Sequence, residues 1–475
     1  MLPAESHGGG RTHADFGYAL AEYLLAPRQA MSEGASVERD TTEQPHTAEQ
    51  PHTAAPPDTA EPRDLKPFVA LEAATLIAGT GNGVAAIALP WLTLQLTNDP
   101  AAAGIVVAAG AIPTLIASLA SGVIIDRLGR QRTSVGSDVF SAVSAAMIPL
   151  FALLGVLTYP LVVVASVIGA TFDPVGVTAR EAMLPDVAKR GRLELERVNG
   201  VHEAVWGMAW LIGPGVAGVL IATVGAEASF WAMFAGFVLS AVLVGTACMP
   251  TPPPRVHPKQ HWLRDALDGL HHVMREPVIR STTVLTTISF TLLYSVIAVV
   301  LPVVYESLNQ PRELGVLFMA FSGAGIVGAL AYSAVGTRLP RRTMYVIGLI
   351  AAAAFTAVFA LSPPYWVQLV AMAVGGFLTG PVNPIANVVF QERTAEELRG
   401  RALSMVFAMS YALFPIGYVV TGFMIKAYGA AWTFGAMAIV LGLVAGWSLF
   451  TPALRGMDSA PQLAEETGAE ISRQT

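Results

Sequence analysis

Long apolar runs recur along this chain, and they constrain its fold more than any other feature. A helix needs roughly 20 apolar residues to cross a bilayer. Twelve such runs lie between residues 66 and 452, near 67–96, 101–125, 133–157, 160–184, 198–224, 227–249, 279–307, 313–337, 343–362, 365–390, 402–426 and 430–451. We therefore expect an all-α membrane protein with twelve transmembrane helices. The composition agrees, because charged residues make up only 13% of the chain, against about 25% in a soluble domain.

The basic residues are distributed unevenly between alternate loops. One set of loops holds eighteen of them, whereas the other set holds only Arg312 and Lys426. The eighteen are Arg127, Arg130, Arg132, Lys189, Arg190, Arg192, Arg197, Arg255, Lys259, Arg264, Arg275, Arg280, Arg338, Arg341, Arg342, Arg393, Arg399 and Arg401. Because cytoplasmic loops carry an excess of Lys and Arg, the bias predicts a multi-pass protein of the cell membrane with both termini in the cytoplasm.

Several classes of function are disfavoured by what the sequence lacks. The net charge of -6 offers no basic footprint for nucleic acid. Cys248 is the only cysteine, so we expect no internal disulfide and no Cys/His metal site. No P-loop pattern is present, so ATP is not the direct energy source. No nucleophile–base–acid set is visible, so we expect neither an enzyme nor a cofactor.

The apolar runs form two groups of six. We expect a disordered, Pro-rich cytoplasmic tail over 1–65, a six-helix half over 66–249, a cytoplasmic linker over 250–278, a second six-helix half over 279–452 and a cytoplasmic tail over 453–475. Met31 offers an alternative start, in which case the first thirty residues lie outside the natural protein.

The linker contains a short pattern with helical spacing. Leu263, Ala266, Leu267, Leu270 and Met274 recur at i, i+3, i+4, i+7 and i+11. This predicts an amphipathic helix on the membrane surface or under the bundle. The neighbouring pair of histidines is interpreted as part of its polar face rather than as a metal site.

The two halves repeat one pattern. The fourth apolar run ends in Arg180-Glu181-Ala182-Met183-Leu184-Pro185-Asp186, and the tenth ends in Phe390-Gln391-Glu392-Arg393-Thr394. Each run also carries a proline near its middle, Pro174 or Pro384. Parallel six-helix halves with a binding site between them are a known transporter design.

The loop between the second and third runs carries a motif. It reads Gly122-Val123-Ile124-Ile125-Asp126-Arg127-Leu128-Gly129-Arg130-Gln131-Arg132. This closely resembles G-x-x-x-D-R-x-G-R-R, the signature loop of the major facilitator superfamily, which implies two pseudo-symmetric six-helix halves. A random basic loop would explain the charges but not the spaced Gly, Asp and Gly. The counterpart in the second half, Ser333 to Arg342, is degenerate.

The resemblance implies that this loop latches the two halves together on the cytoplasmic side. The residues of this latch would be Gly122, Asp126, Arg127, Gly129 and Arg130, with Glu181 or Asp186 as the partner of Arg130. Gly122 would let helices pack closely, and Gly129 would allow a tight turn. Asp126 would pair with Arg127 or Arg130, or would face the positive N-terminus of a neighbouring helix.

Two further stretches are similar to the macrolide-efflux and enterobactin-exporter branch of the superfamily. One is 180–186 followed by Asn199-Gly200, and the other is Gly213-Pro214-Gly215-Val216-Ala217-Gly218. The second stretch is also similar to the exporter motif G-x-x-x-G-P-x-x-G-G. It departs in spacing, since Gly207 lies one residue too early, and Ala217 replaces a glycine. An exporter motif and a small-residue packing face both remain open, and both predict a close helix contact and a bend at Pro214.

A proton gradient is the expected energy source, and it requires a titratable group within the membrane. Asp173 is the best candidate, because it lies near the middle of the fourth run, where desolvation disfavours the charged carboxylate. It could instead be neutralised by a neighbouring Arg or cap a helix broken at Pro174. His202, Glu203 and Glu72 are further candidates, and each could equally be a polar residue at the cytoplasmic rim.

Polar and aromatic residues within the runs are the candidates for contact with a substrate. They are Asn82, Trp91, Trp206, Trp210, Tyr294, Asn383 and Asn387. The last two lie one turn apart on one helix face, whereas the aromatic residues could equally mark interfaces or packing. The small number of fixed charges favours a hydrophobic or amphipathic substrate.

Together these patterns predict a monomeric secondary transporter in the lipid bilayer. We expect it to export a small molecule, such as a drug or a siderophore, by proton-coupled alternating access. A proton-coupled uptake symporter and a non-transporting membrane sensor or scaffold are the alternatives.

Overall fold

The computed structural model of the chain describes residues 64–246, 262–335 and 338–458. The predicted N-terminal tail up to residue 63, the start of the predicted linker and the chain from residue 459 lie outside the described residues. Within the described part, twelve helices are long and apolar enough to cross a membrane. The prediction of an all-α, twelve-helix membrane protein is therefore confirmed.

The first six spans are single helices. They are α2 (Lys66–Thr97), α3 (Pro100–Leu128), α4 (Arg130–Leu153), α5 (Tyr159–Gly191), α6 (Leu195–Val224) and α7 (Ala226–Thr246). A shorter helix, α8 (Trp262–Arg275), occupies the segment in which an amphipathic helix is predicted. It packs against α15, where Val273 is fully buried beside Ala402.

The second six spans include two interrupted helices. The seventh span joins α9 (Pro277–Ser295), a π-helical turn (Val296–Val300) and α10 (Leu301–Ser307), and the tenth joins α13 (Tyr365–Thr379) and α14 (Val382–Glu392). The others are α11 (Pro311–Val335), α12 (Arg341–Ala360), α15 (Glu396–Tyr428) and α16 (Ala430–Phe450), followed by a 3-10 helix over Pro452–Asp458. π-helical turns within membrane helices are frequent at functional sites.

Single glycines separate three pairs of consecutive spans. Gly129 lies between α3 and α4, Gly225 between α6 and α7, and Gly429 between α15 and α16. Their φ angles of 85°, 89° and 81° lie in the region that L side chains rarely adopt. The tight turn expected at Gly129 is therefore present.

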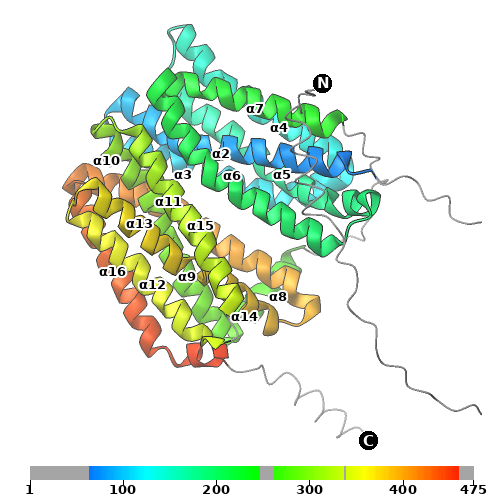
Figure 1. Cartoon of the computed structure of the whole chain (residues 1–475), viewed down its shortest axis with the longest axis vertical. Coiled ribbons are helices and arrows are strands. Elements are labelled where there is room, and N and C mark those ends of the chain that lie inside the picture. Colours follow the sequence, from blue (N-terminus) through cyan, green and yellow to red (C-terminus); the bar gives the residue numbers. More distant parts are fainter. Residues whose placement is uncertain (1–63, 247–261, 336–337, 459–475) are drawn as a thin grey trace, which may run out of the picture.

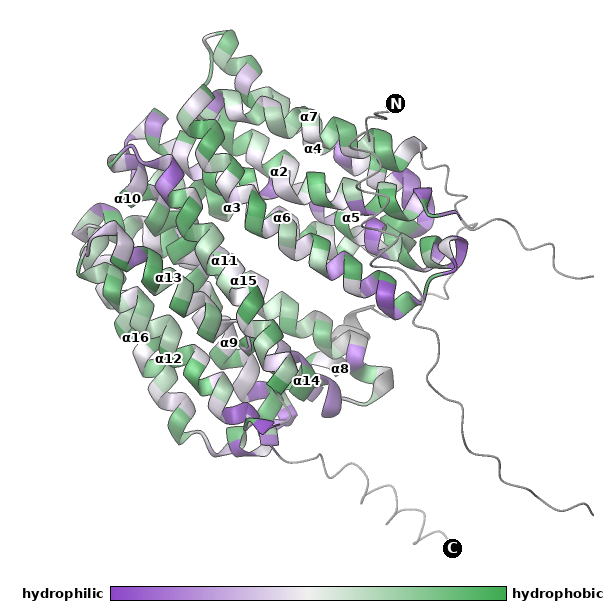
Figure 2. Cartoon of the chain, in the orientation of Figure 1, coloured by the Kyte–Doolittle hydropathy of each residue, from purple (hydrophilic) through white to green (hydrophobic). Residues whose placement is uncertain are grey.

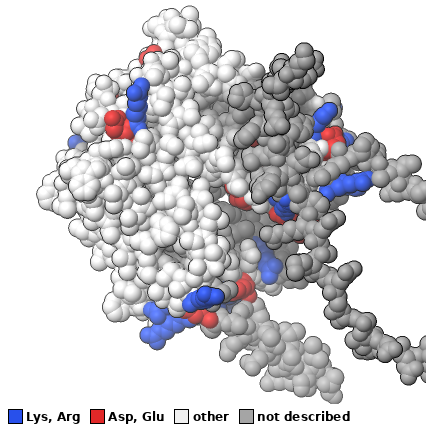
Figure 3. Space-filling view, in the orientation of Figure 1, with Lys and Arg blue, Asp and Glu red and all other residues white. Residues whose placement is uncertain are grey.

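The outer surface of the bundle suits lipid. Large apolar side chains such as Leu443, Trp432 and Phe450 are 69%, 77% and 83% exposed, and apolar residues colour most of the helix surface in Figure 2. Figure 3 shows the visible charged side chains near the helix ends, with a broad uncharged band between them. Such a band can only be solvated by hydrocarbon, so this is a multi-pass membrane protein.

The two halves meet at one end of the bundle and diverge at the other (Figure 1). We call the diverging end, which carries α8, Arg130 and Arg341, the basic side, and the end that carries α10 and Asp99 the far side. Helices α6 and α11, α3 and α15, and α2 and α10 pack against each other across the boundary between the halves.

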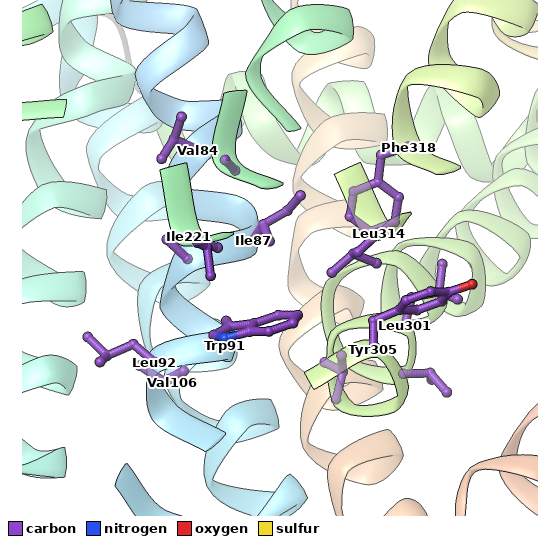
Figure 4. Packing of buried hydrophobic residues seen from close by; sticks show 14 of the residues in the cluster. Val84, Ile87, Trp91, Leu92, Val106, Ile221, Leu301, Tyr305, Leu314 and Phe318 are labelled. Atoms are coloured by element: carbon purple, nitrogen blue, oxygen red, sulfur yellow. The ribbon is translucent and has the colours of Figure 1, made fainter. Parts of the chain in front are cut away.

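Apolar packing seals the far side. Trp91 of α2 is 1% exposed, and Figure 4 shows its ring lying between α2 and the helices that carry Leu301 and Leu314. Ile221 of α6 and Phe318 of α11 belong to the same buried cluster. Because lipid is as apolar as these side chains, the contact is stabilised by close packing rather than by exclusion of water.

The backbones also touch on the far side. A Cβ added at Gly422 of α15 would lie 2.8 Å from the carbonyl oxygen of Pro100, and one at Gly315 of α11 would lie 2.7 Å from that of Pro214. Only glycine permits such an approach, so the two halves are in direct backbone contact there.

On the basic side, the glycines of α3 and α6 make no such close contact. A Cβ added at Gly122 of α3 or at Gly200 of α6 would meet no described atom within 4 Å. The expected close packing at Gly122 is therefore not found in this conformation, because the helices of the two halves have diverged at this level.

Candidate functional site

A central cavity of about 490 Å³ lies between the two halves. The first half contributes residues of α2, α3, α5 and α6, including Trp210 and Pro214, and the second contributes residues of α9, α11 and α15 with the π-helical turn between α9 and α10. Phe318 separates it from the far-side seal, since this side chain belongs to both. The cavity is of the size that takes a drug-like molecule.

Aromatic rings line the second-half wall of this cavity. The ring centroid of Phe414 lies 5.3 Å from that of Tyr294 and 5.6 Å from that of Tyr411. Tyr294 comes directly before Ser295 and the π-helical turn, which shifts the helical register and so re-aims the residues around it. The wall can stack against planar or ring-shaped groups.

A second pocket of about 270 Å³ lies within the second half, and we call it the amide pocket. Asn383 and Asn387 of α14 line it, together with threonines of α9 and residues of α15. Tyr294 lines both this pocket and the central cavity. The structure therefore brings three of the predicted substrate-contact residues together in one wall.

A third pocket, of about 170 Å³, lies within the first half and holds the predicted proton-coupling acid. Asn82 of α2 donates a hydrogen bond from Nδ2 to Oδ1 of Asp173 of α5, at 2.9 Å. Phe230, Met233 and other apolar residues line most of the remainder of the pocket, together with Ser141, Ser144 and Ser166. Asp173 thus has an uncharged hydrogen-bond partner in a largely apolar surrounding.

One buried ion pair near this acid is absent from the sequence-based site. Arg180 of α5 is 1% exposed, and its Nη1 donates to both carboxylate oxygens of Asp138 of α4, at 2.9 and 3.1 Å. Ser240 of α7 donates a further hydrogen bond to Asp138, at 2.7 Å. The Nε and Nη2 atoms of Arg180 are buried and have no partner among the described residues. The sequence does contain an indication of this pair, because Arg180 and Asp138 are both ionisable residues within apolar runs.

Two other candidates form a pair that sequence spacing could not reveal. Nδ1 of His202 in α6 lies 3.1 Å from Oε1 and 3.3 Å from Oε2 of Glu72 in α2. Both side chains are buried, at the basic ends of their helices. Glu203 is exposed and is not part of this contact.

The motif loop forms an ion pair within the first half. Arg130 Nη1 lies 2.7 Å from Asp186 Oδ2, so Asp186 rather than Glu181 is its partner. The degenerate second half forms the equivalent pair, in which Arg341 donates to both oxygens of Glu392 at 2.5 and 2.9 Å.

Asp126 and Arg127 stand apart from that ion pair. Both are exposed, and neither forms an ion pair within the described part of the chain. The expected pairing of Asp126 with Arg127 or Arg130 is therefore not found in this conformation. The halves are separated on this side, so a partner across the boundary is out of reach.

A different ion pair joins the halves on the far side. Lys426 Nζ of α15 lies 2.6 Å from Asp99 Oδ2, and Asp99 also caps α3 by accepting from the Ala101 backbone NH at 2.9 Å. The hydrogen bond from the Lys426 ammonium, reinforced by the helix cap, holds the pKa of Asp99 below its ordinary value. The pair is partly exposed, so water screens it.

The remaining predicted residues serve packing. Trp91 lies in the far-side seal and does not line the central cavity. Trp206 packs beside Gly79 of α2, and a Cβ added at Gly213 would lie 2.8 Å from the Cα of Gly83. Gly218 faces the backbone of Pro311 across the boundary. Pro214 lies inside the continuous helix α6.

Two six-helix halves around a central cavity, with paired charges at matching helix ends, define a membrane transporter of the major facilitator fold. The family model described as transmembrane secretion effector matches residues 59–471. The chain belongs to this family of the major facilitator superfamily, and the predicted superfamily is thereby confirmed.

Individual proteins agree with this assignment. The chain is 35% identical over 399 residues to the multidrug efflux pump Tap of Mycolicibacterium fortuitum, which covers 83% of this chain and 98% of Tap. It is 21% identical over 356 residues to the enterobactin exporter EntS of Escherichia coli O1:K1, which covers 75% and 84%. The crystal structure of the nucleoside transporter NupG matches with a TM-score of 0.66 at 14% identity and covers 82% and 99%. The predicted resemblance to an exporter branch is therefore confirmed.

Proposed function

We propose that this protein exports a hydrophobic or amphipathic small molecule from the cytoplasm by proton-coupled alternating access. The observation that carries the proposal is the central cavity, which both halves line and which apolar packing closes on the far side. The similarity to Tap, which is named a multidrug efflux pump, supports a drug-like substrate and the outward direction.

We assign the basic side to the cytoplasm. The assignment follows the excess of arginine and lysine there, because positively charged loops are retained in the cytoplasm. It places α2 and the segment after α16 with their outer ends in the cytoplasm, so both termini would be cytoplasmic. The conformation is then inward-open, with the central cavity accessible to a cytoplasmic substrate.

We assign proton binding to Asp173. An ionised carboxylate accepts the hydrogen bond from Asn82, and a protonated one could donate to the amide oxygen after the amide rotates. Asp173 can therefore form a hydrogen bond with Asn82 in either protonation state. The pair formed by Glu72 and His202, nearer the cytoplasm, would pass protons between water and this pocket.

The motif residues would act when the passage closes on the cytoplasmic side. Asp126 and Gly122 are exposed while the halves are apart. When the halves approach, Gly122 would permit close packing and Asp126 would face a helix N-terminus of the second half. The ion pair between Arg130 and Asp186 would keep the loop in position.

Transport into membrane vesicles tests direction and coupling. Everted and right-side-out vesicles containing the protein are given an inside-acid gradient, and entry of two fluorescent dyes, daunomycinone and ethidium, is followed. Gradient-dependent entry of at least one dye into everted vesicles supports export. Entry that requires the opposite gradient, with the outside acid, would indicate a proton symporter, and no entry under either gradient would indicate a non-transporting protein.

The same assay tests the role of Asp173. Asp173→Asn keeps the size of the side chain but cannot release a proton, so we expect gradient-driven entry to fall to the level of vesicles without the protein. Glu227→Gln is the matched control, because it neutralises an exposed carboxylate in the first turn of α7. An Asp173→Asn protein that still responds fully to the gradient contradicts the assignment.

A further inference from the structure

The described walls of the amide pocket and of the central cavity carry no charge. Among the residues that the structure describes, none that lines either space is Asp, Glu, Lys, Arg or His. The pocket of Asp173 adjoins the central cavity and shares Ala85, Leu89, Ser166 and Ala170 with it, but it lies within the first half, shares no lining residue with the amide pocket, and has its carboxylate engaged by Asn82. An ion that entered the amide pocket would lose water without gaining a counter-charge, which is costly.

The two asparagines supply unused hydrogen-bonding groups. Asn383 and Asn387 are exposed to the pocket, and neither side chain forms a hydrogen bond within the described chain. Two of the neighbouring threonine hydroxyls are already engaged, since Thr287 bonds Ser410 at 2.9 Å and Thr286 bonds Tyr345 at 2.7 Å. Each free amide offers both an acceptor and donors.

The amides and the aromatic wall face the same space. Tyr294, Tyr411 and Phe414 line both the amide pocket and the central cavity. A ring system could stack on this wall while one polar edge reaches α14. Aromatic rings also attract cations, but here no carboxylate of the pocket lining would reinforce that attraction.

We propose that the amide pocket selects uncharged ring compounds that carry a hydrogen-bond donor and an acceptor side by side, such as a phenol next to a carbonyl. Asn383 and Asn387 bind this edge, and the wall around Tyr294 holds the rings. The proposal rests on the proposed function and names its substrate class. It also separates recognition, in the second half, from proton binding at Asp173, in the first.

Equilibrium binding to the purified full-length protein tests this without any gradient. The probes are daunomycinone, an uncharged ring system with phenols beside carbonyls, and ethidium, a ring cation. We expect wild-type protein to bind daunomycinone more tightly than ethidium. Asn383→Ala and Asn387→Ala should each weaken daunomycinone binding about fivefold, as expected for a lost hydrogen bond, and leave ethidium binding unchanged.

Two further variants sharpen the result. Gln391→Ala removes an amide from the same helix one turn away, outside the pocket lining, and should change neither affinity. Asn387→Asp supplies the missing counter-charge and should reverse the preference toward ethidium. If an alanine variant does not fold, this reversal of preference still tests whether the amide pocket binds the probes.

The proposal is overturned if wild-type protein binds ethidium as tightly as daunomycinone, or if folded alanine variants bind daunomycinone normally. Failure of the proposed function is seen separately. Vesicles that transport neither dye, with the binding pattern intact, refute export and leave the pocket assignment standing. Vesicles that transport ethidium while the binding pattern is absent refute the pocket assignment alone.

Discussion

Ionisable side chains inside the first half are held by specific partners. Arg180 and Asp138 neutralise each other at the centre of α4, α5 and α7, and Glu72 contacts His202 between α2 and α6. Among the described residues, Asp173 forms a side-chain hydrogen bond with the amide of Asn82 alone. Among the described residues, the buried acids Glu72 and Asp138 have ionic partners, whereas the half-buried Asp173 forms no ion pair, which suits a group that binds and releases a proton.

The buried ion pair gives a prediction about stability. Arg180→Met leaves Asp138 as an uncompensated buried charge, so we expect the free energy of unfolding to fall by about 3–5 kcal/mol. Arg180→Met combined with Asp138→Asn removes both charges and should recover much of that loss. Thermal unfolding of the purified protein, followed by tryptophan fluorescence, measures both.

A matched control exists at the basic side. Arg130→Met breaks a partly exposed pair with Asp186, and such pairs contribute at most about 1 kcal/mol. If Arg180→Met were no less stable than Arg130→Met, or if the double variant were no more stable than the single one, the pair would not have the role assigned to it.

At the scale of elements, contacts between α6 and α11, between α2 and α10 and between α3 and α15 join the two halves. Close glycine contacts and the ion pair of Asp99 with Lys426 all lie toward the far side. At their basic ends, α3 and α6 carry Gly122 and Gly200, beside which no described atom lies close enough to contact an added Cβ. Each helix could therefore pivot about its middle and exchange one set of contacts for the other.

The far-side ion pair should respond to pH. The Lys426 ammonium lowers the pKa of Asp99, so the pair stabilises the fold fully above the ordinary Asp pKa of about 4. Its contribution is lost as the pH falls through the lowered value, where the carboxylate binds a proton.

Asp99→Asn is a suitable probe of this pair, because asparagine can still cap α3. We expect wild-type protein to have the higher Tm at pH 7, by an amount that corresponds to at most about 1 kcal/mol, and the difference to shrink as the pH falls below about 4. Lys426→Gln should show the same behaviour. A Tm difference that stays constant from pH 7 to pH 3 would show that the charge of Asp99 contributes nothing.

Sequence patterns predicted the helices better than the contacts between them. Hydropathy located all twelve spans because the length of an apolar run is a local property. Trp91 and Trp432 look alike in the sequence, yet one is 1% exposed in the seal and the other is 77% exposed on the surface. Helices that are apolar on every side do not reveal which face meets lipid, so this difference could not be predicted.

The candidate site was predictable in its residue types but not in its pairings. Asn82, Asp173, Asn383 and Asn387 stood out as polar groups within apolar runs, and each lines a pocket. That Asn82 would contact Asp173 depends on the packing of α2 against α5, across 91 residues of sequence. The π-helical turn after Ser295 left no signal, because its residues Val296-Ile297-Ala298-Val299-Val300 fit any apolar helix.

At the scale of the whole molecule, transport requires that the passage never opens on both sides together. The described conformation is sealed on the far side by Trp91 and its neighbours and is open on the basic side. Closing one side and opening the other needs a rotation of two rigid halves, with the same helix pairs in contact throughout. The opening and closing of the two sides can be followed by distances measured between the ends of α6 and the ends of α11.

Distances between spin labels at the ends of α6 and just beyond the ends of α11 test this movement most directly. With Cys248 replaced, one pair of labels is placed at Leu195 and Leu339 on the basic side, and another at Val224 and Leu308 on the far side; all four side chains are exposed. When protons and daunomycinone are varied, we predict that the distance from Leu195 to Leu339 shortens whenever the distance from Val224 to Leu308 lengthens. Two distances that stay fixed, or that lengthen together, would contradict alternating access in this protein.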